Sequence, residues 1–152
     1  GGDGSFTAGL NGFTLQFGAI TQGSAARVAQ LSLGHAGPGG FTDALAGSFD
    51  LSALVPGDAF GVSGFDAFGG LAAGDAVGLT VQLDSTVLGS FDRVVVLNLR
   101  STNASDPAGR ALDPIALHLQ GTVVAVPEPA TYGLMLGGLA LLLARVRRRA
   151  AG

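Results

Sequence analysis

Residues 77–84 read Val-Gly-Leu-Thr-Val-Gln-Leu-Asp, with an apolar side chain at every second position. Successive side chains of a β-strand point to opposite faces, so this alternation predicts a strand with one face buried in a core. Residues 89–100 and 115–126 repeat the pattern. The apolar positions assigned to the buried faces of these three strands are Val77, Leu79, Val81, Leu83, Phe91, Val95, Leu97, Leu99, Ile115, Leu117, Leu119 and Val123.

Weaker runs of the same kind occur earlier in the chain, separated by turns rich in Gly, Asp, Ser and Pro. They predict four more strands, at residues 13–20, 27–33, 48–54 and 60–65. Short alternating strands with turn residues between them are typical of sandwiches. The expected fold of residues 1–126 is therefore all-β, an immunoglobulin-like antiparallel β-sandwich of about seven strands. No stretch before residue 130 has a helical period.

The C-terminal 26 residues have a different pattern, in three parts. Pro127, Glu128 and Pro129 come first, and an uncharged apolar run then extends from Ala130 to Ala144. Proline fixes φ, lacks an N–H donor and favours extended geometry in the residue before it, so the first part predicts a stiff segment suited to an enzyme cleft. The third part consists of four arginines, which are Arg145, Arg147, Arg148 and Arg149.

The apolar run predicts one transmembrane helix that is short for a permanent anchor. Its 15 residues span about 22 Å as a helix, whereas the hydrocarbon core is about 30 Å thick. By the positive-inside rule the arginine end stays in the cytoplasm and residues 1–126 are exported. The charges agree, since residues 1–126 carry ten Asp and four Arg for a net −6, and residues 127–152 carry Glu128 and four Arg for a net +3.

The stretch at residues 126–149, from Val-Pro-Glu-Pro-Ala-Thr-Tyr to the arginines, resembles the PEP-CTERM protein-sorting domain of exopolysaccharide-producing Gram-negative bacteria. The resemblance implies that residues 127–152 form a sorting signal. Pro127, Glu128 and Pro129 would be its processing motif, Ala130 and Ala144 the ends of its membrane span, and the arginines at 145–149 its basic stop. It also implies an exosortase, an integral-membrane cysteine transpeptidase, as the processing enzyme, and the inner membrane as the site of the precursor.

A second set of short motifs lies in the exported part. Residues 15–18 (Leu-Gln-Phe-Gly), 60–64 (Phe-Gly-Val-Ser-Gly), 74–75 (Gly-Asp) and 89–91 (Gly-Ser-Phe) occur in an order that resembles choice-of-anchor D and related ASH-like domains. The resemblance implies an immunoglobulin-like module of a bacterial surface protein.

Composition excludes several kinds of function. The chain has no Cys, which removes disulfides and thiol chemistry. The acidic exported part argues against nucleic-acid binding, which needs basic patches. The chain begins Gly1-Gly2 without Met, so we expect a signal peptide or further N-terminal residues in the precursor.

Candidate catalytic and metal-binding residues are sparse. His35 and His118 are the only histidines, and neither has a neighbour at ligand spacing. The ten aspartates are spread along the chain rather than clustered as in a calcium loop; we interpret most as turn residues, with calcium between loops as the alternative. No G-x-S-x-G elbow or marked pair of carboxylates is present. The sequence therefore predicts no enzyme, no cofactor and no metal site.

These observations predict an exported, non-enzymatic protein of the cell surface or extracellular matrix, associated with exopolysaccharide or biofilm. Its precursor would cross the inner membrane once, with a cytoplasmic C-terminus, until exosortase cleaves it. The mature form would lie in the cell envelope, on the surface or in the matrix, with exopolysaccharide and other copies paired through sheet edges as candidate partners. The alternative is a permanently anchored periplasmic or surface module that binds carbohydrate or calcium. A glycan hydrolase is a distant third.

Overall fold

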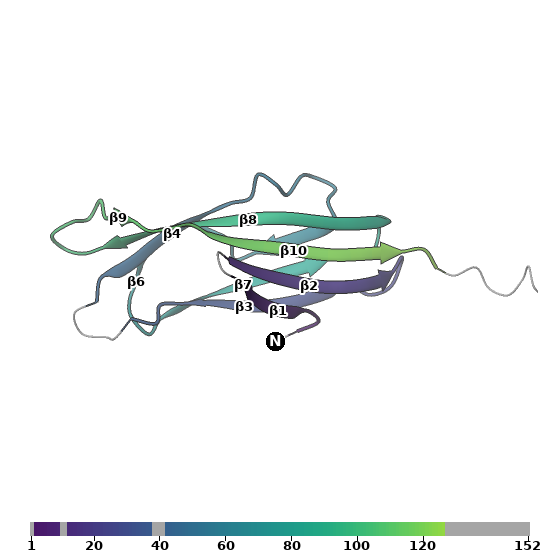
Figure 1. Cartoon of the computed structure of the whole chain (residues 1–152), viewed down its shortest axis with the longest axis horizontal. Helices are drawn as coiled ribbons and strands as arrows, with labels where there is room; N and C mark the ends of the chain where they lie inside the picture. The colour runs from purple at the N-terminus through teal and green to yellow at the C-terminus, as the bar shows by residue number, and fades with distance from the viewer. Residues whose placement is uncertain (1, 10–11, 38–41, 127–152) are drawn as a thin grey trace, which may run out of the picture.

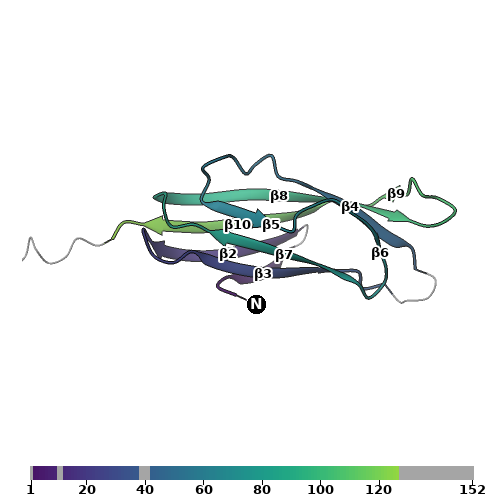
Figure 2. The ribbon, with the colours of Figure 1, turned by 180° about the vertical axis from the view of Figure 1, so that it is seen from behind.

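The computed structural model describes residues 2–9, 12–37 and 42–126, which form two β-sheets packed face to face (Figures 1 and 2). The smaller sheet has the spatial order β3 (Arg27–Gly34), β7 (Ala76–Leu83) and β5 (Phe60–Ser63). The larger has the order β1 (Ser5–Gly9), β2 (Gly12–Thr21), β10 (Ile115–Val124), β8 (Gly89–Thr102), β4 (Ala44–Asp50) and β6 (Phe68–Leu71), and β9 (Arg110–Ala111) pairs with β8. The predicted all-β sandwich is confirmed.

Seven principal strands follow the immunoglobulin order. Taken along the chain, β2, β3, β4, β5, β7, β8 and β10 correspond to strands A to G, so that β3-β7-β5 is a B-E-D sheet and β10-β8-β4 is a G-F-C sheet. Strand β2 occupies the place of A but pairs with β10 instead of β3. The strand order therefore supports an immunoglobulin-like sandwich.

The core lies between the sheets on the predicted faces. The largest fully buried side chains are Phe17, Leu15, Leu83, Leu119, Val81 and Val95. In β2 the alternation of buried and exposed side chains shifts by one residue at a β-bulge. The two residues of β2 between Gln16 and Ala19 lie opposite the single residue of β10 between Gln120 and Thr122. Gly18 lies in this bulge with φ of 71°, a value that favours glycine. Phe17 and Ile20 consequently both face the core.

The prediction of a purely antiparallel sandwich is wrong for one pair of strands. β10 runs parallel to β2, with Leu117 opposite Phe13 and Val123 opposite Ile20. The two strands are the first and last long strands of the chain, and parallel neighbours are joined by a long connection. No tight-turn signal in the sequence could therefore reveal this pairing.

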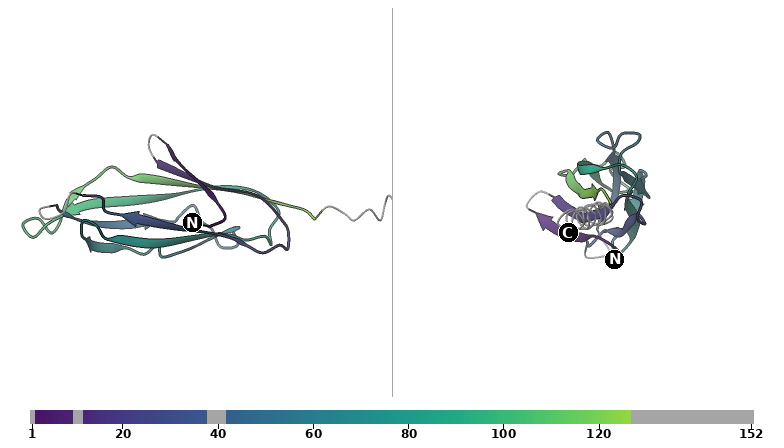
Figure 3. Two further views of the ribbon diagram at one scale, coloured as in Figure 1. Left: turned by 90° about the horizontal axis from the view of Figure 1, so that it is seen from below. Right: turned by 90° about the vertical axis from the view of Figure 1, so that its right-hand side faces the viewer.

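The prediction of about seven strands missed three short ones, since ten strands occur among the described residues. All five residues of β1 are exposed, and β1 and the start of β2 project beyond the side of the sandwich (Figure 3). The sequence of β1 therefore lacks an alternation of apolar side chains that face the core. β6 and β9 have four and two residues, too few for a visible alternation.

The strand predicted at residues 48–54 is displaced, because β4 spans Ala44–Asp50. The small residues of β4 obscure its alternation of apolar and polar side chains. Gly47 packs against the ring of Phe68, and a side chain at position 47 would collide with that ring. Asp50 ends the strand by accepting a hydrogen bond of 2.9 Å from the Ser52 N–H. This aspartate turn stops β4 four residues earlier than predicted.

No helix with the length and hydropathy needed to cross a membrane is found within the described ranges. The helix predicted from Ala130 to Ala144 lies outside the described residues.

Candidate functional site: the end of the sandwich that leads to the C-terminal segment

Strand β10 is paired with β2 to its last residue, at the right-hand end of the sandwich in Figure 1. Val124 lies opposite Thr21, and its carbonyl accepts a hydrogen bond of 2.8 Å from the Gln22 N–H. Ala125 and Val126 follow outside any strand and are exposed. Regular pairing therefore stops two residues before Pro127.

Two loops flank this point and bond to each other. The buried Ser85 hydroxyl donates to the Ser24 carbonyl at 2.6 Å, and the Gly23 N–H donates to the Ser85 carbonyl at 3.2 Å. The Gln22 side chain adds a hydrogen bond of 3.0 Å to the Thr86 carbonyl. We call residues 22–26, 84–88 and 124–126 together the exit end.

The sorting residues predicted from the sequence all lie beyond the described part of the chain. They are Pro127, Glu128, Pro129, Ala130, Ala144, Arg145, Arg147, Arg148 and Arg149. The chain nevertheless limits their distance from the sandwich, because four residue steps separate Val126 from Ala130. At most about 3.6 Å per residue, these steps reach roughly 14 Å. Ala130, where the membrane span is predicted to begin, can therefore lie no farther than this from Val126.

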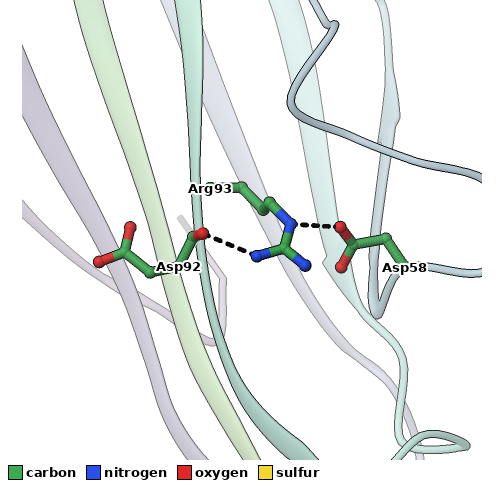
Figure 4. A network of polar contacts seen from close by, with 3 residues as sticks. All are labelled: Asp58, Asp92 and Arg93. Atoms are coloured by element: carbon green, nitrogen blue, oxygen red, sulfur yellow. Dashed lines mark hydrogen bonds and ion pairs between the residues drawn. The ribbon is translucent and has the colours of Figure 1, made fainter.

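An ion pair that the sequence did not predict joins the β4–β5 connection to the larger sheet. The Arg93 Nε of β8 donates to the Asp58 carboxylate at 2.5 Å, and its guanidinium also donates to the Asp92 carbonyl at 2.9 Å (Figure 4). The Asp58 side chain is 1% exposed, and its Oδ1 is buried without a hydrogen-bond partner. Asp58 lies just before β5, so the pair holds the β4–β5 connection against the larger sheet.

Neither histidine is arranged as a metal ligand. His35 contacts both ends of the connection between β6 and β7. Its ring Nδ1 lies 3.1 Å from the Leu71 carbonyl oxygen, and its backbone N–H donates to the Asp75 carbonyl at 3.0 Å. His118 lies on β10 opposite Thr14 and Val94. Within the described ranges, no three His, Cys, Asp or Glu side chains come together in a way that could hold a metal ion.

Several aspartates have the predicted role of turn residues. Asp50, Asp84 and Asp106 accept hydrogen bonds from the N–H groups of Ser52, Thr86 and Gly109, respectively. The hydrogen bonds from the Thr86 hydroxyl and N–H lower the pKa of Asp84, because they stabilise the charged form. Asp84 therefore remains ionised near neutral pH at the exit end.

Asp43 has a different role from the turn aspartates, since it joins two strands. Its carboxylate accepts hydrogen bonds from the Ser101 hydroxyl at 2.7 Å and from the Asn103 amide at 3.1 Å. These two bonds lower the pKa of Asp43. The carboxylate thereby holds the end of β8 beside the start of β4.

One hollow of about 400 Å³ opens between the sheets, away from the exit end. The described residues that line it are mostly apolar and include Phe13, Leu33, Phe49 and Leu117.

Comparisons with known proteins found one family match, near the C-terminus of the chain. Residues 125–149 match the family described as the PEP-CTERM protein-sorting motif. No curated protein matches the chain.

Among solved structures, the chain is similar to the ASH / PapD-like domain 7 of human CEP192, with 15% identity over 72% of this chain and 82% of that one and a TM-score of 0.49. It is also similar to SSP-19, an MSP-domain protein like family member of Caenorhabditis elegans, with 12% identity over 68% of this chain and 94% of that one and a TM-score of 0.47. A third structure is the CupB6 tip adhesin of Pseudomonas aeruginosa, with 10% identity over 73% of this chain and 41% of that one and a TM-score of 0.35. The chain thus carries a PEP-CTERM protein-sorting motif at residues 125–149, directly after an all-β sandwich.

Proposed function

We propose that residues 1–126 are an exported, non-enzymatic domain of the cell surface or extracellular matrix, and that residues 127–152 are a removable sorting signal. The signal holds the precursor in the inner membrane with its arginine end in the cytoplasm. An exosortase then cuts near Pro127, Glu128 and Pro129. The match to the sorting motif at residues 125–149 carries this proposal.

The exit end supports cleavage at this place. A processing enzyme has to bind its target in an extended form, and a segment already paired in a sheet cannot enter a cleft. β10 ends at Val124, and Ala125 and Val126 are exposed and outside the sheet. Within the described residues, the hydrogen-bonded ladder therefore ends at Val124, before the matched motif begins.

The proposal is tested by expressing the precursor with an N-terminal epitope in a host with and without an exosortase. We expect the epitope-tagged chain to lose the mass of the residues after the cut, and to leave the inner membrane, only when the enzyme is present. A full-length chain in the inner membrane of both hosts would contradict the proposal. It would leave a permanently anchored module that binds carbohydrate or calcium as the remaining function.

The mature domain also has an edge suited to pairing with a second copy. β1 is the outer strand of the larger sheet, all its residues are exposed, and its sequence Ser-Phe-Thr-Ala-Gly carries no charge. Exposed edges without charges or proline can pair with another chain. We expect sedimentation velocity to show concentration-dependent dimers that Thr7→Pro abolishes, whereas dimers that persist in this variant would exclude the β1 edge. In the matrix, such pairing would assemble the domain beside exopolysaccharide.

A further inference from the structure

Exposed apolar side chains are concentrated at the exit end. Seven large apolar side chains are exposed among the described residues, and four of them belong to the exit end. These four are Val87 at 43%, Leu88 at 49%, Val124 at 41% and Val126 at 58% exposure. Single exposed apolar residues are ordinary on a protein surface. Four at one end of an elongated sandwich form a surface that requires an explanation.

The loop that carries Val87 and Leu88 is held in place by the domain itself. Its Thr86 N–H donates to the Asp84 carboxylate at 2.7 Å, and its Ser85 hydroxyl donates to the Ser24 carbonyl at 2.6 Å. These two polar groups of the loop are thus bonded inside the protein. The two aliphatic side chains are left at the surface.

The exit end is nearly free of charge. Among residues 22–26, 84–88 and 124–126, Asp84 is the one charged side chain. Binding to nucleic acid or to an acidic protein would require basic residues, which these segments lack. A partner for this surface must therefore be recognised through apolar contact.

The position of the surface identifies the partner as a lipid bilayer. The apolar run begins at Ala130, at most about 14 Å along the chain from Val126. The headgroup region is about 5–8 Å deep on each side of the hydrocarbon core. If the apolar run enters the bilayer as proposed, the domain is tethered with its exit end within reach of the headgroups.

We propose that the exit end is a membrane-contacting surface, whose Val87 and Leu88 enter the interfacial layer of the bilayer that holds the precursor. This inference rests on the proposed function, since it requires the C-terminal segment to enter that bilayer. The contact would keep residues 127–129 at the membrane surface, where an integral-membrane enzyme works. The two side chains have fewer aliphatic carbons than one myristoyl chain, which by itself binds membranes only marginally. The contact would therefore not retain the domain after cleavage.

The test uses the full chain in phosphatidylcholine vesicles and a fluorophore on one introduced cysteine, because the chain has none of its own. Ala25→Cys places the label at the exit end, and Ala104→Cys places it in the loop before β9, at the opposite end (Figure 1). Both alanines are exposed, so the two labels are matched. We expect aqueous iodide to quench the Ala25→Cys label at least threefold less than the Ala104→Cys label, with no further protection from anionic lipid.

Replacing Val87 and Leu88 with aspartate should make the two labels equally accessible. Leu112→Asp is the matched control, because Leu112 is 40% exposed and lies after β9, at the opposite end; it should change nothing. Circular dichroism checks that each variant is folded.

Extraction with carbonate distinguishes failure of the membrane contact from failure of the proposed anchoring. A chain that resists extraction while its Ala25→Cys label stays as accessible as the Ala104→Cys label would overturn the membrane contact and leave the proposed anchoring intact. A chain that carbonate removes would overturn the proposed anchoring, and the contact with it.

Discussion

Replacing Pro127, Glu128 and Pro129 with alanine is expected to slow cleavage of the precursor at least tenfold in a host that contains exosortase. Two prolines fix the local backbone in an extended form and remove two N–H donors, and alanine restores both freedom and donors. Glu128 is the only glutamate in the chain, so its carboxylate is the obvious charged group for recognition. We expect the processing rate to fall at least tenfold, or about 1.4 kcal/mol of transition-state stabilisation. Pulse–chase labelling with mass analysis measures it.

The matched control replaces Asp113 and Pro114 with alanine. This is also an acid beside a proline, and both residues are exposed just before β10. The control should be processed at the wild-type rate. If the control were as slow as the motif variant, the loss would come from changes near β10 in general and not from recognition of residues 127–129.

Strands with one fully buried face could be predicted to within one or two residues. β7 and β8 are central in their sheets, and the alternation of Leu79, Val81 and Leu83 follows directly from burial between two neighbours. β1 could not be predicted, because its order comes from pairing with β2 and not from burial. The parallel pairing of β10 and β2 could not be predicted either. The alternation of apolar residues indicates which face of a strand is buried but not which strand lies beside it.

The candidate site shows a similar division. The sorting motif could be identified from the sequence because it is local and continuous. The exit end could not, since it combines two loops and the end of β10, which only the fold brings together. One partner of the Asp58–Arg93 pair could be recognised in the sequence. Residues 91, 95, 97 and 99 are apolar on the inward face of β8, and Arg93 interrupts that series. A charge in a core-facing position requires a buried partner, but nothing in the sequence selects Asp58 among ten aspartates.

Replacing Arg93 with methionine should strongly destabilise the sandwich. The change leaves the Asp58 carboxylate of the β4–β5 connection, which is 1% exposed, without its counter-charge. Loss of one partner of a buried pair costs about 3–5 kcal/mol, and we expect about 3 kcal/mol because Arg93 is itself 31% exposed. Urea unfolding of the full chain in mild non-ionic detergent, followed by far-ultraviolet circular dichroism, measures it, since the chain has no Trp to report by fluorescence.

Replacing both partners, Asp58 with leucine and Arg93 with methionine, should recover most of the lost stability, to within about 1 kcal/mol of wild type, because no buried charge remains. Arg100→Met is the matched control on the same strand, where the guanidinium donates to the Ala108 carbonyl at an exposed site; it should cost about 0.5 kcal/mol or less. A double variant as unstable as Arg93→Met alone would contradict the electrostatic role. The loss would then come from the other hydrogen bond of the guanidinium, to the Asp92 carbonyl, and the Asp58 carboxylate would be incidental to the stability of the sandwich.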